Sequence, residues 1–289
     1  MAKLPCGDFG QCGGIMFKAP SILLCVACLF VMAGSVTAQP SAEDAYLEFR
    51  RWFNAQPEDV RAGDVPAAYR AHLIEQGLGS DEIDKLLRVL QDGRERQEVE
   101  MWNRVLTAET PRFNTDPNAY LVRVVKGRQP GRALDVGMGQ GRNAIWLAAQ
   151  GWDVTGFDPA DKAVTLAREL ADEAGVEIKT EIVGSEEFEW GSEQWDLVVL
   201  SYVSSREWVE TIRSALRPGG LVMLEAFHDD ATKNASIGRG VVFDTNELLE
   251  RFSDFRILDY EDTTAAADFG KGDTRVVRLL AMKEQPSTP

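Results

Sequence analysis

Alternate glycines between an apolar segment and a helical one constrain the fold of this chain more than any other feature. Residues 133–136 read Ala-Leu-Asp-Val, and glycines then occupy every second position of residues 137–141. A helix is expected at residues 142–150, and a second strand, at residues 153–157, is followed by Asp158. A strand, a glycine turn and a helix, with a carboxylate at the tip of the next strand, predict a nucleoside-binding corner of a doubly wound α/β sheet.

The spacing of the three glycines indicates which cofactor this corner holds. Dinucleotide-binding dehydrogenases favour G-x-G-x-x-G, but here the glycines are Gly137, Gly139 and Gly141, and residue 142 is Arg. The G-x-G-x-G spacing, with Asp135 two residues before the first glycine, resembles motif I of the class I S-adenosylmethionine (SAM) methyltransferases. A nucleotide-dependent oxidoreductase is the less favoured alternative.

The resemblance extends to both sides of the glycines. Residues 102–121, 141–148 and 151–158 are similar to the small-molecule methyltransferases of the tellurite-resistance and thiopurine type. The similarity covers about residues 100–283. It implies a seven-stranded Rossmann-like methyltransferase sheet, SAM as the cofactor, and methyl transfer to a small-molecule acceptor by in-line displacement.

Strand–helix alternation continues beyond this corner, as an α/β fold requires. The near-continuous apolar run at residues 195–202 predicts a strand that is buried on both faces. Two closing strands are expected at residues 256–261 and 274–283. The other expected strands are 178–183 and 221–227, and the other expected helices are 118–126, 162–174, 206–216 and 245–252.

Predicted cofactor contacts gather at the ends of the first two strands. Gly137 and Gly139 allow the backbone to approach a ligand where a Cβ would collide, and the amides at this helix N-terminus suit the SAM carboxylate. Asp135 is expected near the SAM ammonium, and Asp158 at the ribose hydroxyls. The neighbouring residues that complete this part of the predicted site are Met138 and Pro159.

Alternatives are open for both carboxylates, since Asp135 could cap the helix or turn and Asp158 could be a plain loop carboxylate. The loop after the third expected strand departs from the methyltransferase pattern. The family places an Asp there for the adenine amino group, whereas this chain has Ser185. Ser185 or the adjacent Glu186 is expected to replace that Asp, with Phe188 as an apolar contact.

The catalytic residue is unknown from the sequence, because in-line methyl transfer needs little acid–base machinery. Tyr202, at the end of the fourth expected strand, is predicted to face the sulfonium and the acceptor, with a satisfied core aromatic as the alternative. His228 is the best candidate base for an acceptor that must lose a proton, with a structural histidine as the alternative. The chain has only two histidines, and no metal site is expected.

The first 38 residues differ in composition from the rest. Residues 22–33 form an unbroken apolar run that is short for a membrane span. Small residues before Gln39 predict a secretory signal peptide at residues 1–38, cleaved after Ala38, with Met16 as the more usual start. Cleavage would make the protein secreted or periplasmic. Because all four cysteines lie in the predicted signal peptide, the cleaved protein would also be free of thiols. A retained membrane anchor is the alternative.

Helical patterning follows the signal segment. Helices are expected from Ser41, at residues 66–76, and from Ser80 with a break at Gly93. A helical cover packed on the catalytic domain is the expected role, and a lid that shapes the substrate site is the alternative. The expected boundaries are 39–104 for the helical extension, 105–283 for the methyltransferase domain and 284–289 for a disordered tail.

The net charge of −15 argues against a nucleic-acid partner, because binding to a phosphate backbone needs a cationic face. A small-molecule substrate is expected instead, with no stable membrane span after signal cleavage. SAM is a cytosolic metabolite, so the export signal gives weight to a second hypothesis. In it, the chain is a non-catalytic SAM-fold binding protein of the cell envelope.

Overall fold

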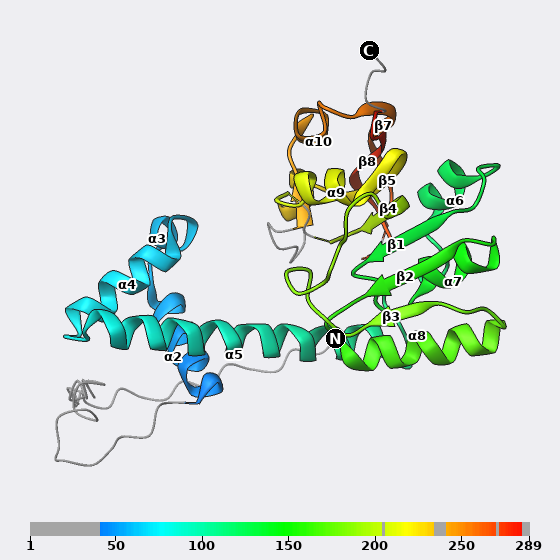
Figure 1. The fold of residues 1–289 in the computed structure, drawn as a ribbon. Coiled ribbons are helices and arrows are strands. Elements are labelled where there is room, and N and C mark those ends of the chain that lie inside the picture. The colour runs from blue at the N-terminus through cyan, green and yellow to red at the C-terminus, as the bar shows by residue number, and fades with distance from the viewer. Residues whose placement is uncertain (1–40, 204–205, 234–240, 270–271, 285–289) are drawn as a thin grey trace, which may run out of the picture. The chain divides into compact units, whose positions relative to one another are not determined.

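The computed structural model describes residues 41–203, 206–233, 241–269 and 272–284 (Figure 1). The signal peptide and most of the tail predicted from the sequence lie outside the described residues. Internal contacts divide the chain into two units, Met1–Arg94 and Glu95–Pro289. Because one helix continues across this division, the boundary expected at residue 104 stays a prediction.

The described part of the first unit is entirely helical outside its turns. Ser41 Oγ accepts the Asp44 N–H at 3.2 Å and Asp64 Oδ1 accepts the Ala67 N–H at 2.9 Å, so a side chain caps each of two helices. The helices that begin in this unit are α2 (Ala42–Ala55), α3 (Glu58–Ala62), α4 (Val65–Glu75) and α5 (Ser80–Leu106).

Aromatic side chains hold the first unit together. Tyr69, Leu73 and Ile83 are buried, and Phe49 and Trp52 pack against them. The Phe49 and Tyr69 rings meet edge to face with their centroids 5.0 Å apart, an arrangement that aromatic pairs favour. The unit therefore has a small apolar core of its own.

The predicted helix break at Gly93 is wrong, because α5 runs without interruption from Ser80 to Leu106. A glycine inside a helix costs about 1 kcal/mol relative to alanine, which packing can outweigh. A Cβ at Gly93 would collide with the Ala42 carbonyl oxygen. The glycine therefore permits the start of α2 to approach α5 closely.

The second unit contains the sheet. Its strands follow the order β3-β2-β1-β4-β5-β8-β7, with the short β6 paired to β5 off this path. The first five in this order are parallel and β8 is antiparallel to both neighbours; Figure 1 shows β3, β2, β1 and β4 side by side. The strands are β1 (Arg132–Val136), β2 (Asp153–Phe157), β3 (Lys179–Glu181), β4 (Trp195–Ser201), β5 (Leu216–His228), β6 (Val242–Phe243), β7 (Arg256–Ala266) and β8 (Asp273–Met282).

The seven strands on this path confirm the doubly wound class and the terminal hairpin. The eighth, β6, is an addition to the seven-stranded expectation, and its two residues are too few to show a periodic pattern. It pairs with the end of β5 through Phe227 and Val242. The helices of this unit, besides the end of α5, are α6 (Ala119–Val125), α7 (Arg142–Ala149), α8 (Asp161–Ala174), α9 (Val209–Ala215), the 3₁₀ helix η1 (Asp229–Lys233) and α10 (Glu247–Arg251).

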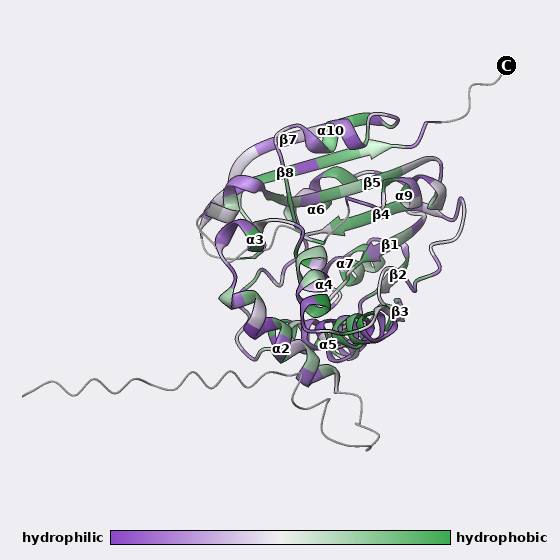
Figure 2. Cartoon of the chain, turned by 90° about the vertical axis from the view of Figure 1, so that its left-hand side faces the viewer, coloured by the Kyte–Doolittle hydropathy of each residue, from purple (hydrophilic) through white to green (hydrophobic). Residues whose placement is uncertain are grey.

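Strand β4 shows why the sheet needs helices on both faces. Leu197 and Val199 lie in the core cluster that includes residues of α6 and α7, whereas Val198 and Leu200 lie in the cluster that includes residues of α9 and α10. Alternate side chains of a strand point to opposite faces, so a continuous apolar run is buried on both. Figure 2 shows the hydrophobic colour along much of β4 and β5.

The parallel strands end at the same edge of the sheet. Val136 at the end of β1 pairs with Phe157 of β2 and with Leu200 of β4. The segments that follow, beginning at Gly137 and Asp158, therefore emerge side by side, where ligands of open α/β sheets bind. Among the described residues, no helix has the length and apolar character that a membrane crossing needs.

Candidate active site

The glycine turn after β1 adopts backbone conformations that other residues rarely take. Gly137, Gly139 and Gly141 have φ values of 63°, 55° and 78°, in the left-handed region that favours glycine. A Cβ on Gly137 would also collide with Val203, and one on Gly139 would lie 3.2 Å from the Leu106 side chain. A Cβ on Gly141 would lie 3.0 Å from the Ala167 Cβ, so all three glycines are required by backbone conformation and by close contacts.

Asp135, at the end of β1, carries the most informative polar atom of the site. Its side chain is 2% exposed, and its Oδ2 has no hydrogen-bond partner among the residues that the structure describes. Burial raises the pKa of this carboxyl to about 7, although the Arg142 charge and the Ala144 amide lower it. The Ala144 contact fits the capping alternative, but the unpaired oxygen fits a ligand cation, because a buried carboxylate oxygen without a partner is costly.

Asp158 joins the two turns at this edge of the sheet. Its Oδ2 accepts the Gly139 N–H at 2.9 Å, and its Oδ1 accepts the Ala160 N–H at 2.8 Å. The side chain is buried, and burial raises its pKa despite these two amides. The carboxylate of Asp158 is thus turned toward the glycine turn, and its ribose role stays a prediction. Pro159, beside it, is exposed.

A narrow cleft opens over the glycine turn. Of the residues predicted to contact the cofactor, Gly137, Met138 and Gly139 line it. The others are not among its lining residues: Asp135, Asp158, Pro159, Ser185, Glu186 and Tyr202. The lining residues are Leu106, Phe113, Gly137, Met138, Gly139, Gln140, Arg142, Asn143, Ser201 and Phe269.

The glycine turn and the neighbouring Asp135 fit SAM, but the volume of the cleft over the turn is small. The unpaired oxygen of Asp135 suits an ammonium group, and the glycine turn leaves no Cβ in the way. The cleft holds only about 40 Å³, whereas pockets for small molecules are roughly 300–1,000 Å³. Leu106 and Val203 reach into the glycine turn. A nucleoside can therefore enter only when these side chains move aside.

The loop after β3 uses its aromatic residue in the core. Phe188, expected as an apolar contact for adenine, is buried and stacks on Phe157 with ring centroids 4.2 Å apart. Ser185 is partly exposed, and its carbonyl accepts the Trp190 indole N–H at 3.1 Å. Glu186 is exposed. The adenine roles of Ser185 and Glu186 stay predictions.

Tyr202 follows β4 in a left-handed backbone conformation, with φ 59°. Its hydroxyl donates to Glu225 Oε1 at 2.5 Å and accepts the Asp268 N–H at 3.2 Å. Burial, followed by the Glu225 charge, raises the pKa of this phenol far above its ordinary value. A hydroxyl that makes two hydrogen bonds and stays protonated suits the alternative of a satisfied core aromatic better than a base.

His228, at the end of β5, is buried among polar partners. Its Nε2 lies 2.9 Å from Thr245 Oγ1, and its Nδ1 accepts the Asp230 N–H at 3.0 Å. These contacts assign the proton to Nε2 and occupy both ring nitrogens. Because His228 is also not among the lining residues of the cleft, the geometry favours the structural histidine over the catalytic one.

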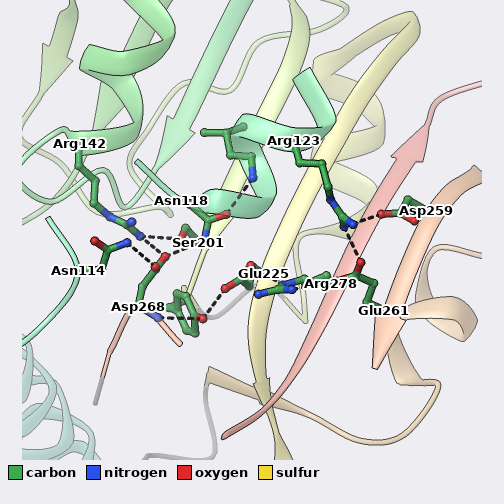
Figure 3. Close-up of polar contacts among 12 residues, drawn as sticks. Asn114, Asn118, Arg123, Arg142, Ser201, Glu225, Asp259, Glu261, Asp268 and Arg278 are labelled. Atoms are coloured by element: carbon green, nitrogen blue, oxygen red, sulfur yellow. Dashed lines mark hydrogen bonds and ion pairs between the residues drawn. The ribbon is translucent and has the colours of Figure 1, made fainter. Parts of the chain in front are cut away.

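Sequence reasoning missed a buried ion pair beside the cleft. Arg142, at the start of α7, lies 2.6 Å from Asp268 Oδ2, and its guanidinium also donates to Ser201 Oγ at 3.1 Å (Figure 3). The two charged side chains are 9% and 8% exposed. An arginine directly after the glycine turn was a visible signal, but nothing in the sequence around Asp268 pointed to its partner.

Comparison with known proteins identifies the family of this chain. A profile of the family described as "Tellurite resistance protein TehB" matches residues 111–281. The probable S-adenosyl-L-methionine-dependent methyltransferase TehB of Haemophilus influenzae is 26% identical over 161 residues, covering 52% of this chain and 55% of that protein. The crystal structure of TehB from Haemophilus influenzae is 21% identical, with a TM-score of 0.51, and the match covers 58% of this chain and 62% of that one.

A second solved structure shares the fold. The N-methyltransferase NodS from Bradyrhizobium japonicum, in complex with S-adenosyl-L-homocysteine, is 16% identical, with a TM-score of 0.52 over 65% of this chain and 97% of that one. At such identities the structural likeness concerns the fold alone. The chain spans about half the length of the curated relatives it matches. Since the profile covers more than half of the 289 residues, the chain belongs to the tellurite resistance protein TehB family.

Proposed function

We propose that this chain is a SAM-dependent methyltransferase that acts on a small-molecule acceptor. The observation that carries the proposal is the unpaired, buried Oδ2 of Asp135 beneath a turn of three left-handed glycines. When bound, SAM supplies a methyl group on a sulfonium, which an acceptor nucleophile takes by in-line displacement. The family and its SAM-dependent members support the same cofactor.

The chain's own residues act by binding and alignment. In this proposal Asp135 holds the ammonium group of SAM, and the amides at the start of α7 hold its carboxylate. Leu106, Phe113 and Phe269 give the cleft an apolar lining. Holding two reactants in line can lower a barrier by about 7–11 kcal/mol, so this geometry can supply much of the catalysis.

The cleft lining offers no evident general acid or base for proton transfer. Among its lining residues in the described part of the chain there is no Asp, Glu, His, Lys, Cys or Tyr. A general base must lie within hydrogen-bond reach of the proton that it removes. The favoured acceptor is therefore one that attacks through a lone pair without first losing a proton to the protein.

Calorimetry tests the cofactor, and release of labelled methyl tests the reaction. We expect SAM to bind the purified chain and NADH not to bind. Labelled SAM should then transfer its methyl group to at least one member of a panel of thiols, halides, metalloid oxyanions, phenols and neutral nitrogen heterocycles. Binding of NADH in place of SAM would overturn the proposal in favour of an oxidoreductase.

The closed cleft favours one second candidate, a SAM-fold protein of the cell envelope that binds without catalysis. A volume of about 40 Å³ leaves no room for SAM and an acceptor together unless the lining residues move. SAM binding with no transfer to any panel member would select this candidate. Export from the cytosol is part of both proposals, and N-terminal sequencing of the expressed protein tests the predicted cleavage after Ala38.

A further inference from the structure

Strand β7 forms one edge of the sheet. It is the last strand in the strand order, after β8, and Figure 2 shows it at the margin of the sheet. It is 11 residues long, whereas β3 at the opposite edge has 3. Over the residues that the structure describes, no backbone hydrogen bond joins β7 to any segment other than β8. Every second residue of β7 therefore presents its N–H and C=O along the outer edge without a backbone partner.

Most of β7 lacks the features that normally keep an edge strand from pairing with another chain. Such features are lysines, prolines and bulges. The strand contains no lysine and no proline. Its one irregularity lies near its start, between Ile257 and Asp259. The run from Tyr260 to Ala266 is therefore a regular strand with an open edge.

The carboxylates of β7 are paired within the chain. Asp259 and Glu261 lie 3.1 and 2.6 Å from the Arg123 guanidinium (Figure 3). Asp262 lies 2.6 Å from Arg275. Side chains of a strand point to the two faces of the sheet, so these ion pairs lie over the faces. They balance the charge of β7 and leave its outer edge open to a further strand.

The distribution of charge along β7 selects one pairing partner and one register. The three carboxylates lie within residues 259–262, and residues 263–266 read Thr-Thr-Ala-Ala. If a second copy pairs antiparallel with Thr263 opposite Thr263, the acidic half of each strand lies opposite the uncharged half of the other. A register centred within residues 259–262 would instead place carboxylates opposite each other, which is destabilising. Threonine pairs across strands are favourable, so the register centred on Thr263 is preferred.

We propose that two copies of this chain pair antiparallel through their β7 edges, with Thr263 at the two-fold axis, and so form one continuous sheet. The contact uses the same surface of both copies. It therefore closes as a dimer and covers the edge in each copy. The inference concerns the assembly of the chain and does not depend on the proposed acceptor.

The same edge leads into the candidate active site. Asp268 follows β7 by two residues, and its carboxylate accepts hydrogen bonds from Asn114 and Arg142. Phe269, the next residue, lines the cleft. Pairing between copies would therefore hold the strand that carries these two residues to the cleft.

Sedimentation equilibrium of the purified chain over a concentration series tests the dimer. We expect the wild type to reach twice the mass of one chain. Thr263→Lys should remain at the mass of one chain, because two lysines would meet at the two-fold axis. The matched control is Thr274→Lys on β8, one strand inside the edge, which should dimerise as the wild type does. A wild type that stays monomeric, a Thr263→Lys variant that dimerises equally well, or equal loss of the dimer in both variants would overturn the proposal.

A change of charge at Thr264 tests the register. Thr264 is exposed, and in the proposed register it lies opposite Asp262 of the second copy. The dimer Kd should be lower for Thr264→Lys than for Thr264→Glu by about tenfold, because each substitution acts at two symmetric contacts. Within one chain Thr264 pairs with Arg275 of β8, which favours glutamate, so an effect on folding alone predicts the opposite order. Equal dimer Kd values, or the opposite order, would overturn the register.

Hydrogen exchange measures the pairing at the backbone. Peptides that cover residues 259–266 should exchange about tenfold more slowly in the wild-type dimer than in Thr263→Lys at the same concentration, because outward N–H groups gain partners. Peptides that cover β3, the opposite edge, should exchange equally in both proteins. Equal exchange over residues 259–266, or slower exchange over β3 instead, would overturn the proposal even if the wild type is a dimer.

Discussion

The two sides of the cleft are built in different ways. The residues of the glycine turn come from one short stretch of sequence. The positive φ values occur at the three glycines that the sequence pattern identifies. The opposite wall takes Phe113 from before β1 and Phe269 from beyond β7. Local sequence determines the first side, and the tertiary structure assembles the second.

This difference predicts a division of effects. Changes in the glycine turn should alter SAM binding, because that side provides backbone amides and the Asp135 carboxylate. Changes at Phe113 and Phe269 should have a smaller effect on SAM binding, because that side contributes apolar side chains to the cleft lining and no charged group. A Phe269→Leu variant that loses as much SAM affinity as Gly137→Val would contradict the division.

The largest effect is expected from Gly137→Val. A valine there must adopt a φ of 63° and collide with Val203, so the turn must move away from the cofactor. We expect SAM affinity in calorimetry to fall by more than about 100-fold, since a near-attack site tolerates little displacement. Circular dichroism should show that the domain remains folded.

Gly175→Val is the matched control for backbone strain. Gly175 ends α8 with a φ of 68°, and a Cβ there would have no neighbour within 4 Å. Both variants should lose about 1–2 kcal/mol of unfolding free energy for the left-handed conformation. Only Gly137→Val should lose SAM affinity. Unimpaired SAM binding by Gly137→Val would show that the pocket is elsewhere.

The second effect is a pH dependence of SAM binding. Burial raises the pKa of Asp135 to about 7, so the carboxyl of the free protein is increasingly protonated below this pH. An ammonium ligand needs the ionised form. SAM affinity should therefore fall about tenfold per pH unit below about pH 7 and level off above it. Titration calorimetry at several pH values measures this.

The same carboxyl makes the stability of the free protein depend on pH. A raised folded-state pKa means that the folded state binds its proton more tightly than the unfolded chain does. The contribution to the unfolding free energy is therefore largest below the ordinary Asp pKa of 3.8 and is lost as pH rises through about 7. Asp135→Asn should remove this part of the dependence in urea unfolding, and an unchanged pH profile in that variant would assign it to another group.

The sequence predicted those elements whose own periodicity or composition matches their place in the tertiary structure. The buried run of β4, the glycine turn and the closing hairpin each show their period or composition directly. Asp268 could not be found in this way, because it lies 154, 150 and 126 residues from Asn114, Asn118 and Arg142. The helix break expected at Gly93 was wrong for a related reason. The glycine there is explained by its contact with α2, which the sequence does not show.

Asp158→Ala should have the third-largest effect. The change leaves the Gly139 and Ala160 amides without their acceptor, which loosens the glycine turn. We expect SAM affinity to fall about tenfold and the unfolding free energy to fall by about 1–3 kcal/mol. The control is Asp172→Ala on the exposed side of α8. SAM affinity equal to that of the control would remove Asp158 from the site.

Val203→Ala tests how far the Val203 side chain limits entry of SAM into the narrow cleft. Val203 contacts Gly137 and must move before a nucleoside enters, so a smaller side chain enlarges the binding-competent fraction. Stopped-flow mixing should show SAM association that is faster by about threefold, because apparent binding scales with the fraction of the protein that is competent to bind. Val277→Ala, in the core of β8, should lower stability without this change. An unchanged association rate in Val203→Ala would mean that another side chain controls entry.

The smallest effect on SAM binding is expected at His228. Because both of its ring nitrogens bond to Thr245 and the Asp230 amide, His228→Ala should cost about 1–3 kcal/mol of unfolding free energy. Thr245→Val removes one of the same bonds and should cost less. SAM affinity and methyl transfer should stay within about twofold of the wild type in both variants. If His228→Ala alone lost transfer by about tenfold or more at an unchanged fold, proton transfer would enter the reaction from the β5 side, and the comparison of the glycine turn with the aromatic side of the cleft would need a third, catalytic, region.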